Sequence, residues 1–309
     1  MARRYDANPS GELALLALLA VLWGSSYLLV EIALATIPPV TLIALRVSIA
    51  AVFLVIFVAC HPARWPRDWT TWRRLLVQAL FNSIASWTLL AWGQQSVDSG
   101  LAGVLNSTSP IFVLGFTWLI TRHEVVTPRK LTGAFLGLAG VGLILGLNVL
   151  QGLGKQTAGQ LAVLASAALY AWAAIHGRRF SSIAPAVTAA GTMLWATLCL
   201  VPLSFVVEKP WTLEPSALSI VAAAALGILC TGIALLVYFR LVRTIGSLGV
   251  ASQSYLRAGV SVLLGVIVLG EHLSTVTMLG LLAIVLGMML INTGWGVFDI
   301  VRGQGRTKS

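Results

Sequence analysis

The chain has 309 residues, of which 58% are hydrophobic and only 10% are charged. Soluble proteins carry roughly 25% charged residues, so a soluble domain of this length would lack the polar surface needed to cover its core. Composition therefore excludes an ordinary soluble protein and predicts an integral membrane protein. The three cysteines, Cys60, Cys199 and Cys230, lie singly in apolar stretches without metal-ligand spacing. We therefore expect no metal site and no cofactor.

Ten apolar segments are each long enough to cross a bilayer. They are 12–35, 39–60, 73–95, 99–121, 130–150, 157–177, 184–207, 217–239, 246–269 and 275–297. Each has roughly twenty residues or more, which is the length that a spanning helix needs. Helices are expected because lipid offers no partner to unpaired backbone groups. Prolines and glycines between the segments mark the turns.

The lysines and arginines predict the orientation of these helices. Nearly all of them fall in alternate loops that include both termini, whereas only Lys155 and Lys209 fall in the other loops. The positive-inside rule therefore predicts cytoplasmic termini in a bacterial-type inner (plasma) membrane. It also explains the net charge of +10 without a nucleic-acid partner.

A shift of 147 residues aligns the first half of the sequence with the second. The aligned identities include Pro38 with Pro185, Leu101 with Leu248, Ser107 with Ser254, Glu124 with Glu271, Gly133 with Gly280, and Gly140 with Gly287. This register predicts two five-helix repeats, 1–150 and 151–309, within one transmembrane domain. Because five is odd, the second repeat enters the membrane from the opposite side. The expected fold is an all-α membrane protein of ten helices in two inverted repeats around a central cavity, an arrangement typical of secondary transporters.

Several short motifs in this order resemble the drug/metabolite transporter superfamily and its ten-helix metabolite exporters. They are Trp23-Gly24-Ser25-Ser26-Tyr27, Pro38-Pro39, Arg46, Gly270-Glu271-His272-Leu273, Gly280 and Gly287. The first repeat departs from the glycine-glutamate pattern, since His123 precedes Glu124. The resemblance implies export of small metabolites by alternating access. Within the superfamily, the chain is most similar to the bacterial aromatic amino acid exporters.

Ionisable and polar residues within the spans are candidate functional residues, because such groups are costly in lipid. Arg257, near the middle of 246–269, is expected to bind a substrate carboxylate or, alternatively, to be a structural arginine. Asn106 and Gln253 are equivalent under the shift and are expected to face a cavity or to form helix-helix hydrogen bonds. Glu31 and Arg46 are expected to form a gating or structural ion pair near the outer surface. Glu124 and Glu271 are expected to cap helix ends or anchor loops.

Other polar and aromatic residues share helix faces that suit an amphipathic ligand. The residues expected to bind substrate are Tyr27, Asn82, Ser86, Trp87, Asn106, Ser107, Tyr170, Trp172, Tyr238, Gln253, Tyr255 and Arg257. The tryptophans have an alternative role as anchors at the membrane interface. His176 is expected to lie at a mouth or to cap a helix, with proton transfer as the alternative.

The sequence therefore predicts a secondary transporter that exports small amphipathic metabolites. Amino acids are the expected class, with aromatic amino acids as the narrower one. The alternatives are a channel or facilitator for small solutes, or an exporter of drugs or organic cations. No catalytic site is expected. The expected partners are a small-molecule substrate and the lipid bilayer, and the chain is expected to be a monomer or a weak homodimer.

Overall fold

A computed structural model describes residues 9–61, 63–97, 99–122, 126–150, 156–257, 260 and 275–292. These residues form helices joined by short turns, with no β-strand among them. In chain order the helices are α1 (Pro9–Leu34), α2 (Pro39–Ala59), α3 (Trp69–Ala79), η1 (Leu80–Ile84), α4 (Ala85–Gln94), α5 (Ser99–Asn106), α6 (Ser109–Phe116), η2 (Thr117–Thr121), α7 (Pro128–Leu150), α8 (Thr157–Gly177), η3 (Arg178–Phe180), α9 (Pro185–Val207), η4 (Pro210–Thr212), α10 (Ala217–Gly227), η5 (Ile228–Ile233), α11 (Ala234–Thr244), α12 (Gly246–Ala251) and α14 (Thr275–Asn292).

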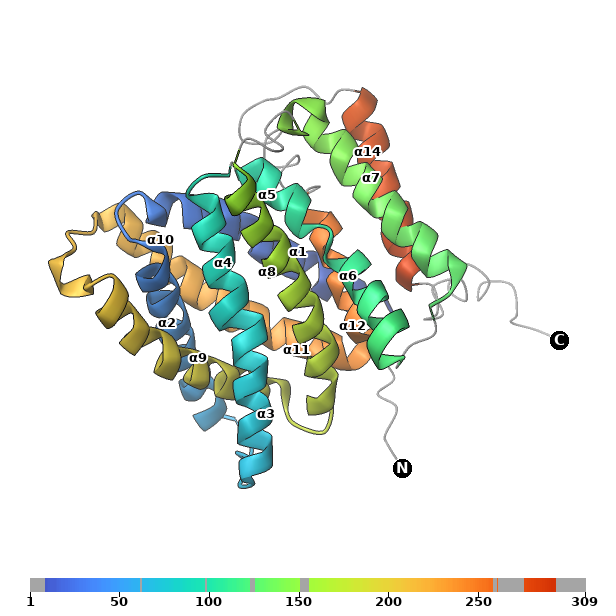
Figure 1. Ribbon diagram of the computed structural model, residues 1–309. Helices are drawn as coiled ribbons and strands as arrows, with labels where there is room; N and C mark the ends of the chain where they lie inside the picture. Colours follow the sequence, from blue (N-terminus) through green and yellow to red (C-terminus); the bar gives the residue numbers. More distant parts are fainter. Residues whose placement is uncertain are drawn as a thin grey trace.

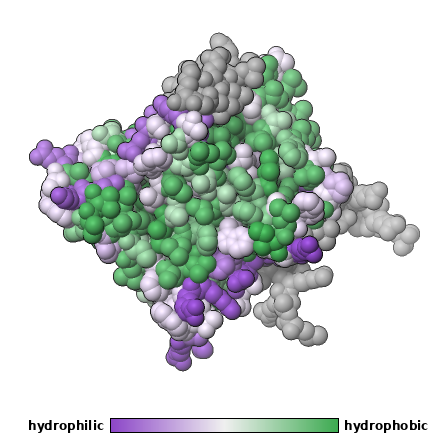
Figure 2. All heavy atoms as spheres, in the orientation of Figure 1, coloured by the Kyte–Doolittle hydropathy of each residue, from purple (hydrophilic) through white to green (hydrophobic). Residues whose placement is uncertain are grey.

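Seven helical spans within the described residues are long and apolar enough to cross a membrane. They are 10–34, 39–59, 69–94, 101–121, 157–180, 185–207 and 217–244. Figure 2 shows a broad apolar surface across the middle of one face, with hydrophilic residues gathered toward its ends. The prediction of an all-helical membrane protein is therefore confirmed.

Helices that are distant in sequence form the main packing pairs. The most extensive are α7 with α14, α2 with α9, and α4 with α8. In Figure 1, α7 and α14 lie side by side at one edge, and α2, α9 and α10 lie at the opposite edge.

Glycines bring the backbones of α7 and α14 into direct contact. A Cβ at Gly140 would lie 2.7 Å from the carbonyl oxygen of Gly280, and one at Gly133 would lie 2.8 Å from that of Gly287. The residue numbers of successive contacts fall along α14 as they rise along α7, so the two helices are antiparallel. Small residues permit such close approach of two helices.

Two predicted helices are interrupted in the structure. The segment 99–121 bends at Ser107 and Thr108, between α5 and α6. Pro110, in the first turn of α6, has no N–H for a regular bond to the preceding turn, so a continuous helix is disfavoured there. In the segment 246–269, α12 ends at Ala251, and helical structure resumes over 253–257. The roles predicted for Glu124 and Glu271 fall outside the described residues.

Three helices contain π-helical turns. η1 separates α3 from α4, η5 separates α10 from α11, and η2 ends the helix after α6. η1 and η5 lie at nearly the same place when the chain is shifted by 147 residues. π-helical turns widen the backbone locally and are frequent at functional sites.

Two buried or half-buried carboxylates tie helices together at opposite ends of α1. Glu208 accepts hydrogen bonds from the backbone amides of Val40 at 3.0 Å and Thr41 at 2.6 Å, and so caps the start of α2. Near the start of α1, the buried Glu12 pairs with Arg240 of α11 at 3.1 Å and accepts from the Thr244 hydroxyl at 2.8 Å.

Candidate functional site

A cavity lies where α1, α2, α4, α5, α8 and the segment 253–257 meet. It is lined by Trp23, Ser26, Tyr27, Arg46, Ser86, Trp87, Leu90, Asn106, Ser166, Tyr170 and Arg257. The space between these side chains, including the part open to solvent, amounts to about 370 Å³. The lining combines aromatic rings, small hydroxyls and two arginines, but none of these described lining residues is acidic.

Arg46 is the more buried of the two arginines, with a side chain only 4% exposed. Its Nε donates to the Thr231 hydroxyl at 2.7 Å, and its Nη2 donates to the Cys230 carbonyl at 3.3 Å. The guanidinium carbon lies 4.1 Å from the centre of the Trp87 ring, a cation–π distance. Within the described part of the chain, no carboxylate forms an ion pair with Arg46.

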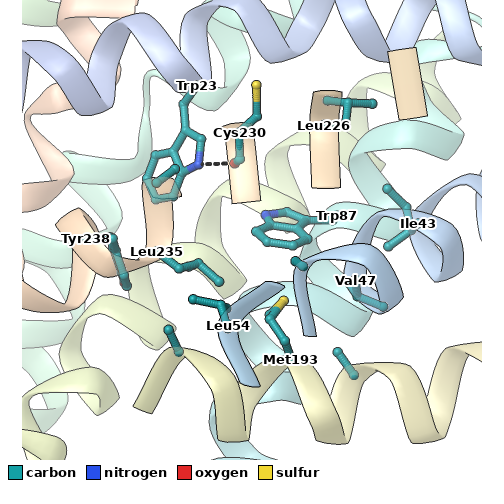
Figure 3. Close-up of a cluster of buried hydrophobic side chains, with 14 of the residues drawn as sticks. Trp23, Ile43, Val47, Leu54, Trp87, Met193, Leu226, Cys230, Leu235 and Tyr238 are labelled. Carbon is teal, nitrogen blue, oxygen red and sulfur yellow. Dashed lines mark hydrogen bonds between the residues drawn. The ribbon is translucent and has the colours of Figure 1, made fainter. Parts of the chain in front are cut away.

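The π-helical turn η5 supplies the groups that hold Arg46 in place. The Cys230 carbonyl accepts a second hydrogen bond, from the Trp23 indole Nε1 at 2.9 Å (Figure 3). The Thr231 hydroxyl donates to the carbonyl of Leu226 at 2.7 Å, five residues earlier, which leaves its oxygen to accept from Arg46. One irregular turn thereby orients both an arginine and a tryptophan of the cavity.

Arg257 is half-buried and reaches the cavity from the segment 253–257. Its Nε donates to the Gln253 Oε1 atom at 2.8 Å, and its Nη1 donates to the Tyr27 hydroxyl at 3.2 Å. The guanidinium carbon lies 5.0 Å from the centre of the Trp23 ring. Each arginine of the cavity therefore lies against a tryptophan, and Arg46 is held by neutral oxygens.

Several uncharged polar groups complete the lining. The Ser86 hydroxyl contacts the Ser166 hydroxyl at 3.0 Å and carbonyl at 3.1 Å. The buried Tyr170 hydroxyl has no hydrogen-bond partner among the described residues. The Asn106 side chain is 6% exposed and lines the same cavity. Tyr170 and Asn106 thus add a hydroxyl and an amide to the cavity wall.

The structure thus brings six of the residues predicted to bind substrate to one cavity. These are Tyr27, Ser86, Trp87, Asn106, Tyr170 and Arg257. These six residues lie together, and their role in substrate binding stays a prediction.

Six other predicted residues lie outside the lining. Asn82 is fully buried in η1 and donates to the Ser83 hydroxyl. Trp172 packs against Phe81 and Phe116 on the other side of α8, with ring centres 6.4 and 5.7 Å away. Tyr238 lies behind the cavity, because its ring packs against Trp23 at 5.4 Å. All three side chains pack between helices, and the buried Asn82 Oδ1 atom and Tyr238 hydroxyl have no hydrogen-bond partner among the described residues.

The remaining three predicted residues lie beside the segment 246–257. Ser107 donates to the carbonyl of Ser254 at 3.2 Å. Tyr255 points toward α7, where its hydroxyl donates to the carbonyl of Ala134 at 2.8 Å. Gln253 is fully buried and contacts the cavity only through its hydrogen bond to Arg257. Gln253 thus positions the Arg257 side chain and does not itself line the cavity.

The predicted ion pair between Glu31 and Arg46 is absent from the structure. Glu31 is exposed on α1. Arg46 instead turns into the bundle toward η5, because the oxygens of Cys230 and Thr231 are within hydrogen-bond distance there. Arg46 is therefore a cavity residue.

His176 lies away from the cavity. Its Nδ1 contacts the Oε1 atom of the buried Gln78 at 3.0 Å, and its ring packs edge-on against Phe180 at 5.6 Å. These contacts link α8 to α3 near the end of the bundle.

Four lining residues besides Arg46 are not among those predicted to bind substrate, namely Trp23, Ser26, Leu90 and Ser166. Helical spacing contains a signal for three of them. Trp23 lies four residues before Tyr27, Leu90 four after Ser86, and Ser166 four before Tyr170, so each shares a helix face with a predicted residue.

The model of the EamA-like transporter family matches this chain twice, over residues 11–146 and 157–293. The two matches together cover most of the chain and correspond closely to the two halves found in the sequence.

Named relatives extend over nearly the same length. The uncharacterized inner membrane transporter YedA of Escherichia coli (strain K12) is 28% identical over 282 residues, which are 91% of this chain and 90% of that protein. The uncharacterized transporter YvbV of Bacillus subtilis (strain 168) is 28% identical over 286 residues, 90% of each chain. A solved crystal structure shares the fold, with a TM-score of 0.74 at 21% identity over 92% of this chain and 98% of that one. This chain therefore belongs to the EamA-like transporter family and is a membrane transporter.

Proposed function

We propose that the protein is a secondary transporter that exports small amphipathic metabolites bearing a carboxylate, by alternating access. Amino acids, including aromatic ones, are the class that the sequence resemblance favours. The membrane is a bacterial inner membrane, as the name of YedA states for that relative. Both termini are cytoplasmic, in agreement with the distribution of basic residues.

Pairs of contacts related by the 147-residue shift support two inverted repeats. The contact of Gly133 with Gly287 and that of Gly140 with Gly280 exchange when each residue is replaced by its equivalent. The α4–α8 pair exchanges in the same way with the α11–α1 pair. Such exchange is expected of two copies related by a two-fold axis, and the antiparallel α7 and α14 agree with an axis in the membrane plane.

The observation that carries the proposal is the cavity with its two arginines and aromatic rings. An arginine within a membrane protein marks a functional site by default, because its burial is costly. Guanidinium groups bind carboxylates through charge-assisted hydrogen bonds, and Trp23, Trp87 and Tyr170 supply apolar surface for the body of a solute.

Side-chain contacts join helices at the end of the bundle that carries the start of α1. Glu12 joins α1 to α11 through Arg240, and Gln78 joins α3 to α8 through His176. Buried Tyr238, Phe239 and Leu241 fill the space behind the cavity. In the proposed mechanism this end opens when the other end closes, so the solute meets one side of the membrane at a time.

Counterflow in vesicles that contain the purified protein tests this proposal. We expect saturable counterflow of a carboxylate-bearing solute such as phenylalanine. Arg257→Ala is expected to reduce it by at least about tenfold while the protein remains folded, because a charge-assisted contact is lost. Flux that rises linearly with concentration without counterflow would indicate a channel and contradict the proposal.

A further inference from the structure

Arginines and tryptophans are concentrated in one short stretch that leads into α3. Residues 64–74 contain four of the chain's twenty lysines and arginines and three of its eleven tryptophans. They are Arg64, Arg67, Arg73 and Arg74, with Trp65, Trp69 and Trp72 between them. The positive-inside rule accounts for basic residues in this loop, but it does not account for both residue types in one stretch.

This stretch lies at the end of a membrane span. The span 69–94 begins within it, and residues 64–68 precede that span. All four arginines are exposed, and Trp69 is 65% exposed. In Figure 1, α3 points to the lower end of the molecule, and Figure 2 shows hydrophilic residues gathered at that end. The stretch therefore lies where lipid headgroups meet the acyl chains, a depth that tryptophans prefer.

Side-chain contacts hold the stretch in a fixed shape. The rings of Trp65 and Trp72 stack with centres 6.0 Å apart and planes only 6° from parallel. The Trp72 indole Nε1 donates to the carbonyl of Pro66 at 3.1 Å. At the start of α3, the Asp68 carboxylate accepts from the amide of Thr71 at 2.7 Å. The arginines thus extend from an ordered support, which lowers the cost of ordering them around a ligand.

The charge of this end is strongly positive. Four arginines against one aspartate leave residues 64–74 with a net charge of +3. Hydrogen bonding to Thr71, with a smaller contribution from Arg74, holds the pKa of Asp68 below its ordinary value, so this carboxylate is ionised. Arg179 is exposed in η3, and both Arg179 and Arg74 act electrostatically on His176. The end of α8 therefore adds a further charge beside the start of α3.

We propose that the surface formed by residues 64–74 and Arg179 binds the headgroup of an anionic phospholipid. Guanidinium groups bind phosphate oxygens through paired, charge-assisted hydrogen bonds, and basic residues beside a membrane span attract anionic lipids. The acyl chains lie against the exposed ring of Trp69, which packs edge-on against Trp195 of α9 at 6.4 Å. A soluble acidic partner would leave this ring uncovered, whereas a lipid meets both the charge and the apolar surface.

Brominated lipids in vesicles test the proposal. The purified protein is placed in phosphatidylcholine vesicles with a minor fraction of brominated phosphatidylglycerol, which is anionic, or of brominated phosphatidylcholine, which is zwitterionic. Bromine quenches the tryptophans that it contacts, and three of them belong to the proposed surface. We expect phosphatidylglycerol to bind at least about fivefold more tightly than phosphatidylcholine, because the arginines attract its net charge. Tryptophans that contact lipid away from basic residues should respond equally to both lipids.

Charge variants test the arginines directly. Arg73→Gln combined with Arg74→Gln removes two charges and is expected to reduce the preference for phosphatidylglycerol at least about threefold. Arg73→Lys combined with Arg74→Lys keeps both charges and should retain most of the preference. The matched control combines Lys155→Gln with Lys209→Gln, which removes two charges from the loops that the sequence assigns to the opposite end, and should leave the preference unchanged. Elution as a single species in gel filtration identifies the variants that fold.

The outcomes decide between a lipid site and its alternatives. Equal quenching by the two brominated lipids in the wild-type protein would overturn the proposal, as would an unchanged preference after Arg73→Gln with Arg74→Gln. Inorganic phosphate should reduce the preference no more than chloride does at the same ionic strength. Loss of the preference in phosphate alone would indicate a site for the free anion and overturn the lipid assignment. The wild-type comparison decides the question even where a variant fails to fold, and it involves no transport, so the proposed function is tested separately.

Discussion

Two tyrosines show how position within the fold separates binding from packing. Tyr27 lines the cavity and accepts a hydrogen bond from Arg257 through its hydroxyl. Tyr255 is fully buried, and its hydroxyl donates to the Ala134 carbonyl of α7. Both residues are tyrosines within predicted spans, and sequence alone ranked them equally. The difference depends on which neighbour each hydroxyl reaches, which is a property of helix packing.

Removing the Tyr27 hydroxyl is expected to change the KM, whereas removing the Tyr255 hydroxyl is expected to change the stability. Tyr27→Phe frees the Arg257 side chain to move and should raise the KM for a carboxylate solute about threefold to tenfold, with little change in stability. Tyr255→Phe removes the hydrogen bond to the Ala134 carbonyl and should lower the free energy of unfolding by about 1 kcal/mol with an unchanged KM. Counterflow kinetics and thermal unfolding in detergent measure the two effects. Equal shifts of KM in both variants would contradict the placement of the cavity.

At the scale of elements, contacts between equivalent helices hold the bundle together. α7 and α14 meet through glycine backbones, and α2 packs along α9 in the same pairwise manner. Small residues at helical spacing, such as Gly133, Gly137 and Gly140, permit this close approach and are visible in the sequence. The π-helical turns had no such signal. η5 contains no proline, and the Thr231 hydroxyl in it accepts from Arg46, a contact between helices that the sequence alone does not reveal.

Two glycines of α7 form a matched pair for testing this interface. A Cβ at Gly140 would meet the Gly280 carbonyl at 2.7 Å and the Ile284 amide at 2.9 Å, so α14 would have to move away. A Cβ at Gly142 would meet nothing within 4 Å. Gly140→Ala should therefore destabilise the protein by about 1–3 kcal/mol through overpacking. Gly142→Ala should be neutral or stabilise it by up to about 1 kcal/mol through helix propensity. Thermal unfolding of both variants checks the prediction, which fails if Gly140→Ala is the more stable.

At the scale of the whole molecule, long-range patterns in the sequence predicted more than single residues did. Hydropathy and turn residues predicted the helical membrane architecture, because a bilayer restricts which backbone structures can span it. The cavity was harder to predict. Arg46 has the sequence environment of an ion-pair residue near Glu31, but the nearby oxygens of η5 determine its direction. Which face of each helix meets the cavity depends on rotations that periodicity in so apolar a chain does not specify.

The contact between Glu12 and Arg240 allows the carrier mechanism to be tested most directly. These residues join α1 to α11 near the start of α1, with 3.1 Å between carboxylate and guanidinium. The experiment places cysteines at both positions, with Cys60, Cys199 and Cys230 replaced by alanine, and links them with a reducible thiol-specific crosslinker. The variants with a single cysteine at either position serve as controls for modification alone.

Our account predicts that the crosslink abolishes counterflow of a carboxylate solute and that reduction restores it, because α1 and α11 must separate at this end in each transport cycle. The controls with single cysteines should transport before and after treatment. Undiminished counterflow in fully crosslinked protein would contradict alternating access through the cavity of Arg46 and Arg257.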